Sequence, residues 1–108
     1  MNLTELSVMV HTLAIEKGWY EGDSINIPEK LALIHAEVSE ALECYRDDQM
    51  ETWSTASEKP EGFPIEIADI VIRVLDLCGA LGIDIQGAVD QKHAYNATRP
   101  HRHGNKKC

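Results

Sequence analysis

Two pairs of acidic residues in this chain have a spacing that suits metal binding, Glu37-x-x-Glu40 and Glu66-x-x-Asp69. Each pair lies at positions i and i+3 of an otherwise apolar segment with helical periodicity, so each places two carboxylates on one stripe of a helix. Four carboxylates between two helices repel one another unless a hard cation lies among them. Ligation by oxygen alone favours Mg²⁺, with Mn²⁺ as a substitute. We therefore predict a Mg²⁺ site formed by these four side chains.

The positions around the two pairs indicate which way the acids face. At about 100° per residue, Glu37 and Glu40 border the apolar side of their helix. The second pair shares a narrow polar stripe with Arg73 and Asp76, on a helix whose other positions are almost all apolar. Such a stripe needs polar partners, because an unpaired buried charge is costly. A metal ion is one such partner, and a salt-bridge network through Arg73 is the alternative.

A second group of residues near the end of the chain suits phosphate binding. Lys92 and Asn96 lie one helical turn apart, and Arg99 follows. A lysine, an asparagine and the fork of an arginine together match the oxygens of a triphosphate. The alternative is a helix C-terminus whose cations complement the helix dipole. Trp19 is a further candidate for substrate binding by stacking, or else a packing residue.

Four helices are expected to position these residues. The periodicity predicts helices over about residues 3–17, 27–46 and 64–81, and a fourth that begins after the cap Asp84 and runs to about Asn96. Asn26 is the expected cap of the second helix, with Pro28 in its first turn. The polar stretch 47–63 is expected to be a connector, with no strand. The second helix is expected to turn one apolar face to the core: Leu31, Ile34, Val38, Leu42 and Tyr45.

These elements predict an all-α fold, a four-helix bundle in a single domain over residues 1–98 with a short basic tail over 99–108. The third helix is apolar on nearly every side and must be covered on nearly every side. A small chain cannot do this alone, so we expect a homodimer or a homotetramer built from dimers.

Composition narrows the partners. The formal net charge is −8, which argues against nucleic acid as a partner. The sequence has no apolar run of membrane-spanning length and no signal-peptide pattern. We therefore expect a cytoplasmic location and no membrane partner. Three widely spaced cysteines, without a C-x-x-C motif, argue against a disulfide framework and a structural zinc site.

The motifs resemble those of the MazG-like, all-α nucleoside triphosphate pyrophosphohydrolases. That family combines a Glu-Glu-x-x-Glu helix, a Glu-x-x-Asp helix and a Lys-x-x-x-Asn segment. The matching stretches here are 36–40 (Ala-Glu-Val-Ser-Glu), 66–69 (Glu-Ile-Ala-Asp) and 92–96 (Lys-His-Ala-Tyr-Asn). Ala36 stands where the family often has its first glutamate, which is expected to alter the number of metal ions or the geometry around them.

The resemblance implies Mg²⁺-dependent hydrolysis of a (deoxy)nucleoside triphosphate to its monophosphate and pyrophosphate, in nucleotide-pool housecleaning. It implies that Glu37, Glu40, Glu66 and Asp69 bind the metal, that Glu37 or Glu40 acts as the catalytic base, and that Lys92 and Asn96, with Arg99, bind the triphosphate. It also implies a dimer or a dimer-built tetramer with sites near subunit interfaces. Two alternatives stay open: a phosphoribosyl-ATP pyrophosphohydrolase, and a non-enzymatic helical interaction module whose acids form structural salt bridges.

Overall fold

A computed structural model describes residues 1–22 and 24–100 of the chain. Its elements are α1 (Leu3–Glu16), α2 (Ile27–Arg46), β1 (Trp53–Ser54), β2 (Pro60–Glu61), α3 (Phe63–Leu81) and α4 (Ile85–Thr98). The mostly helical character agrees with the predicted all-α class. Of the predicted basic tail over 99–108, all but the first two residues lie outside the described part. Among the helices described, none has the length and apolar character needed to cross a membrane.

Side-chain caps and glycines set the ends of the helices, close to the predicted positions. Asn26 Oδ1 accepts the Glu29 N–H at 3.0 Å, and Asp84 Oδ1 accepts the Gly87 N–H at 3.1 Å. These bonds satisfy N–H groups that the first helical turn leaves without partners. Gly82 ends α3 in the left-handed region, with φ +68°. All four predicted helices are present, with bounds that differ by two residues at most.

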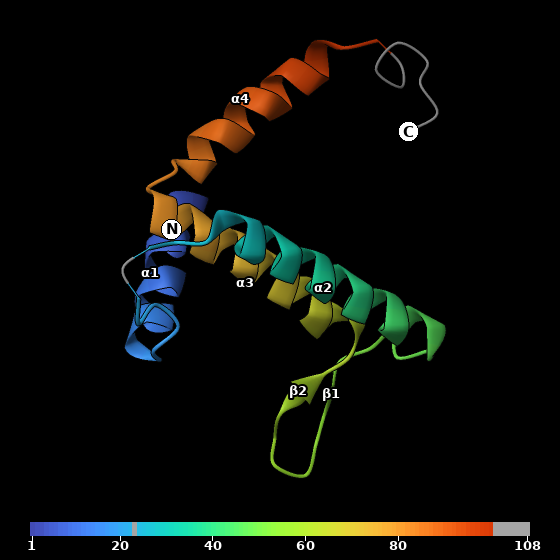
Figure 1. The fold of residues 1–108 in the computed structure, drawn as a ribbon. Coiled ribbons are helices and arrows are strands. Elements are labelled where there is room, and N and C mark those ends of the chain that lie inside the picture. Colours follow the sequence, from blue (N-terminus) through green and yellow to red (C-terminus); the bar gives the residue numbers. More distant parts are fainter. Residues whose placement is uncertain (23, 101–108) are drawn as a thin grey trace.

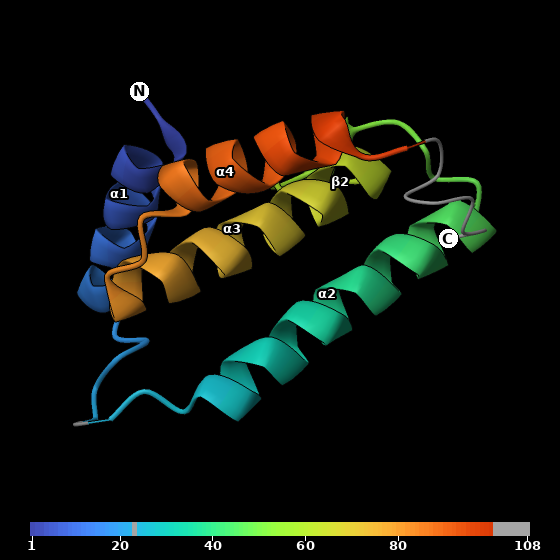
Figure 2. The same cartoon turned by 90° about the horizontal axis from the view of Figure 1, so that it is seen from above.

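Helices α2 and α3 run side by side in opposite directions, and α1 crosses the far end of α3 (Figures 1 and 2). Small residues allow α1 and α3 to approach closely. Ser7 of α1 is only 1% exposed, and a Cβ atom at Gly79 of α3 would overlap the Ser7 carbonyl oxygen and the His11 side chain. The close approach holds α1 across the end of the α2–α3 pair.

The face of α2 that packs on α3 is not the one predicted. Leu31, Val38, Leu42 and Tyr45 were expected in the core, but they are 45–61% exposed. In their place, Glu37 and Ala41 are the buried residues of α2. The prediction was wrong for this chain because α2 packs mainly on a single helix, α3, and only one side of it is covered. The core itself is small: Ala41, Leu75, Leu77 and Cys78.

Helix α4 does not close a four-helix bundle within the chain. It extends away from the other helices (Figure 1) and is joined to α1 at its first turn. There Thr4 Oγ1 donates to Asp84 Oδ1 at 2.6 Å and accepts the Gln86 N–H at 3.0 Å. None of the residues of α4 is buried. The expected four-helix bundle was one assembled as a dimer or a dimer of dimers, and that assembly stays a prediction.

The 47–63 connector contains a short antiparallel hairpin that the sequence reasoning missed. Strand β1 pairs with β2 through Trp53 opposite Glu61 and Ser54 opposite Pro60. Each strand is only two residues long, and one contains a proline. They are too short to show the alternation of apolar and polar residues that predicts a strand. The hairpin lies on the side of the α2–α3 pair opposite to α4 (Figure 1).

Candidate metal centre and adjoining cavity

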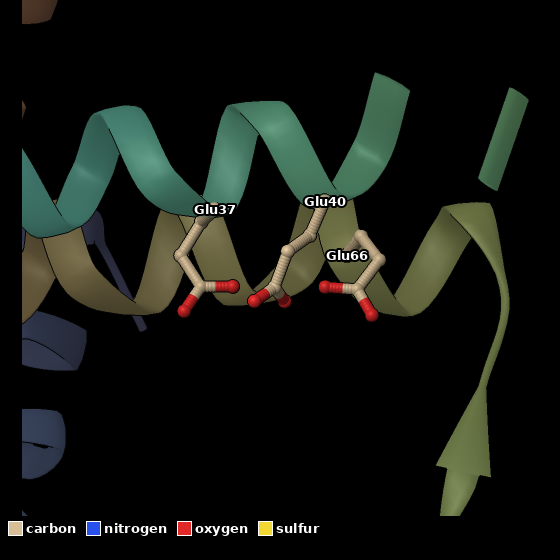
Figure 3. A group of neighbouring side chains, drawn as sticks. All are labelled: Glu37, Glu40 and Glu66. Carbon is tan, nitrogen blue, oxygen red and sulfur yellow. The ribbon is translucent and has the colours of Figure 1, made fainter. Parts of the chain in front are cut away.

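Three of the four predicted acids converge between α2 and α3. Glu37 and Glu40 project from α2 and Glu66 from α3, and their carboxylates turn to the side on which the hairpin lies (Figure 3). One carboxylate oxygen from each residue lies within 4.8 Å of the others. The antiparallel packing brings the first turn of α3 beside the middle of α2, which is why residues 26 or more positions apart meet here.

Two oxygens in this cluster are buried without partners. Glu37 is 9% exposed, and the Oε2 atoms of Glu37 and Glu66 have no hydrogen-bond partner among the described residues. A buried acceptor left unpaired costs free energy, more so when it is charged. A divalent cation would satisfy both oxygens. A donor set made only of carboxylates fits Mg²⁺ or Mn²⁺ better than a metal that prefers nitrogen or sulfur.

Burial and the crowding of acids raise the pKa values of two of them, Glu66 and Asp69. Burial raises the pKa of Glu66 above its ordinary value, and the negative charge of Glu40 raises it further. Burial likewise raises the pKa of Asp69, with the charge of Glu37 adding to the effect and that of Arg73 opposing it. Both carboxyls are thus destabilised in their charged form, as expected for partly buried acids with like charges nearby.

Asp69 lies beside the tight cluster and not within it. It lines the same cavity as Glu37 and Arg73. Arg73 Nε donates to Glu37 Oε1 at 2.7 Å, across the α2–α3 interface. The salt bridge that the sequence offered as an alternative to a metal is therefore present at one oxygen of Glu37, while the other oxygen of the same carboxylate remains without a partner among the residues described.

A cavity of about 730 Å³ adjoins the acids. One part of its wall is apolar and carries Trp19, which the sequence had singled out. The other part is charged, with four cationic side chains beside the acids. The apolar lining residues are Val10, Leu13, Ala14, Trp19 and Ile72, and the charged ones are Lys17, Lys30, Glu37, Lys59, Asp69, Arg73 and Asp76. A ligand with an apolar ring and an anionic chain matches such a wall.

Asp76, at the wall of the cavity, is the centre of a polar network. The sequence patterns did not predict this network. Tyr20 Oη donates to Asp76 Oδ2 at 2.6 Å, and His11 Nδ1 lies 2.9 Å from Asp76 Oδ1. Burial, and then the bond to Asp76, raise the pKa of Tyr20 well above its ordinary value, so its hydroxyl stays a donor. Lys30 Nζ lies 4.3 Å from the centre of the Tyr20 ring. The network joins α1, α3 and the connector between α1 and α2.

The predicted phosphate-binding residues lie elsewhere in the chain. Lys92 on α4 and Arg99 directly after it flank Tyr95, with Lys92 Nζ and Arg99 Cζ 5.1 Å and 5.6 Å from the centre of the Tyr95 ring. Asn96 Oδ1 is buried and has no hydrogen-bond partner in the described part of the chain. Helix α4 rises on one side of the α2–α3 pair, whereas the acids face the other (Figures 1 and 3). Within one chain, the structure does not bring these residues to the acid cluster.

Comparisons of the chain with models of protein families, with curated proteins and with solved structures found no match.

Proposed function

We propose that the protein is a Mg²⁺-dependent pyrophosphohydrolase that converts a (deoxy)nucleoside triphosphate to the monophosphate and pyrophosphate. The observation that carries the proposal is the convergence of Glu37, Glu40 and Glu66, two of them with buried unpaired oxygens, beside a cavity that is part apolar and part cationic. An acidic cluster with unsatisfied oxygens suits the metal, and the cavity suits a base with its phosphates. A cytoplasmic role in nucleotide-pool housecleaning would follow from this activity.

The proposed chemistry assigns each acid a task. Glu37, Glu40, Glu66 and Asp69 would hold Mg²⁺, which when bound supplies neutralising charge and a water of lowered pKa. A carboxylate oxygen of Glu37 or Glu40 that is not engaged with metal accepts the proton of the attacking water. The water attacks the α-phosphorus in line, the bond to the bridging oxygen breaks, and pyrophosphate leaves. Trp19 offers a surface on which the base stacks.

The proposal includes a second copy of the chain. The exposed apolar side chains of α2 are a surface that isolated chains seldom leave uncovered. Lys92 and Asn96 lie on α4, and Arg99 follows its last residue; this helix extends away from the acids of its own chain (Figure 1). We therefore infer a homodimer, or a tetramer of two dimers, in which α4 of one copy reaches the cluster of the other. Pyrophosphate would leave toward Lys92 and Asn96 of that second copy.

One observation favours a different function. The ion pair between Arg73 and Glu37 is what an interaction module with structural salt bridges would contain. Such a module would leave the Oε2 atoms of Glu37 and Glu66 buried and unpaired, at a cost that a bound cation removes. A phosphoribosyl-ATP pyrophosphohydrolase would use the same acids on a different substrate.

The test is a panel of nucleoside and deoxynucleoside triphosphates, including dCTP and dATP, together with phosphoribosyl-ATP. Pyrophosphate and orthophosphate are measured separately, with Mg²⁺ and with a chelator. Pyrophosphate release that requires Mg²⁺ supports the proposal, and the preferred substrate distinguishes the two enzymes. Release of orthophosphate alone contradicts the proposed bond cleavage. Neither product, with no stabilisation by Mg²⁺ in a thermal melt, points to the interaction module.

A further inference from the structure

We propose that Lys59, carried by the β1–β2 hairpin, binds the polyphosphate chain of the substrate from within the same chain as the acids. The inference rests on the proposed function and adds a phosphate contact that the sequence reasoning did not include. It also gives the hairpin a role: to bring one cation to the cavity beside the acid cluster.

The hairpin holds the backbone of Lys59 from both sides. Its N–H donates to Thr55 Oγ1 at 3.1 Å, and its carbonyl accepts the Thr55 N–H at 2.9 Å. The base of the hairpin is equally constrained. Gly62 has φ +113°, and a Cβ atom there would overlap the Glu51 carbonyl oxygen. These bonds fix the backbone position from which the Lys59 side chain extends.

The side chain of Lys59 reaches the cavity that Glu37 and Asp69 line. It remains 72% exposed, and Nζ lies 3.1 Å from Glu61 Oε1 on the neighbouring strand. The bond to Glu61 raises the pKa of Lys59, and the charges of Glu66 and Asp69 add to that effect. The ammonium group is therefore held in its charged form beside the cavity and is accessible to a ligand.

Two other cations of the cavity are engaged with protein groups. Arg73 Nε is bonded to Glu37, and Lys30 lies over the Tyr20 ring. Lys59 has a half-buried carboxylate, Glu61, as its partner. Because the lysine of this ion pair is open to solvent, the pair is weak and a phosphate oxygen can replace Glu61. A polyphosphate held by Mg²⁺ at the acids keeps several oxygens outside the metal's coordination. A lysine at the same cavity is placed to bind them.

The experiment compares Lys59→Ala with two control variants. Arg46→Ala removes one positive charge from an exposed pair with Glu43, away from the cavity. Glu61→Gln removes the partner of Lys59 and keeps the lysine. Substrate KM, inhibition by pyrophosphate, and the shift in melting temperature caused by Mg²⁺ with inorganic tripolyphosphate are measured for each. The shift in melting temperature can be measured without substrate turnover.

We expect Lys59→Ala to raise KM about 10-fold or more, to weaken pyrophosphate inhibition to a similar extent, and to reduce the tripolyphosphate shift. Lys59→Arg should retain part of the affinity, and both control variants should bind as the unaltered protein does. Unchanged affinity in Lys59→Ala overturns the inference. If Glu61→Gln loses as much affinity as Lys59→Ala, the inference is also overturned, because the effect would then belong to the ion pair of the hairpin. If the unaltered protein releases no pyrophosphate from any substrate, it is the proposed function that fails.

Discussion

Arg73 and Glu37 form an ion pair across the α2–α3 interface, with Nε and Oε1 2.7 Å apart. The Glu37 side chain is 11% exposed and that of Arg73 35%. The pair fixes one oxygen of Glu37, while Oε2 is buried and has no hydrogen-bond partner among the residues described. Arg73 thus compensates part of the negative charge and orients the carboxylate that completes the cluster.

Arg73→Met should destabilise the metal-free protein. We expect a loss of about 1–2 kcal/mol in the free energy of unfolding, below that of a fully buried pair because solvent screens the guanidinium. Saturating Mg²⁺ should reduce the loss, since the cation supplies the compensating charge. Chemical denaturation with and without Mg²⁺ measures both values. The double variant Glu37→Gln/Arg73→Met should recover stability, and an additive loss would show that the two residues act independently.

Glu40→Gln and Asp69→Asn should each lower kcat about 100-fold or more, because each removes a charge from the proposed metal and proton-transfer site. The helical circular dichroism signal should not change. Glu43→Gln is the matched control, since Glu43 lies on the same helix and pairs with Arg46 at the surface. Full activity in either of the first two variants would exclude the altered residue from the site.

The metal-free protein should lose stability as pH rises above the unfolded-state pKa values of its acids, about 4. The folded-state pKa values of Glu66 and Asp69 are raised, so folding favours their protonated forms. Their contribution is therefore full below the unfolded pKa values, about 4, and disappears as pH rises through the folded ones. Melting curves across this range should show more stabilisation by Mg²⁺ at the higher pH. A Mg²⁺ effect that does not depend on pH would contradict this coupling.

Mixing two inactive variants should restore activity if α4 acts on a partner's acids. Glu40→Gln and Lys92→Ala homodimers would each have impaired sites, whereas their heterodimer would contain one site with both changes and one with neither. Random exchange predicts recovery of up to about a quarter of the unaltered activity, by the two-fold symmetry of the dimer. The mixture is assayed after dissociation and reassembly, beside each variant alone. No recovery despite confirmed exchange would indicate that the site lies within one chain.

The helices and their ends could be predicted because local rules decide them. The periodicity of apolar residues and the caps Asn26 and Asp84 give the helices within two residues. The i, i+3 spacing of the acids also indicated that Glu37, Glu40 and Glu66 border packed surface, since spacing on a helix fixes which residues share a stripe.

What the sequence did not provide depends on contacts between distant segments. Leu31, Val38, Leu42 and Tyr45 look like a core face, and only the position of α3 shows that Glu37 and Ala41 are the buried residues. The hairpin depends on the backbone bonds around Thr55 and on the positive φ of Gly62, which leave little trace in a pattern of apolar residues. The bond between Tyr20 and Asp76 joins positions 56 apart.

The outward course of α4 has a consequence for how the proposed site comes together. The acids of Glu37, Glu40 and Glu66 meet as soon as one chain folds, a first-order event that dilution leaves unchanged. The α4 residues would arrive only through association, which is second order in protein concentration. On dilution, the single chain would therefore keep its metal ligands and the phosphate contact proposed for Lys59, whereas the phosphate contacts of α4 would be lost with the partner.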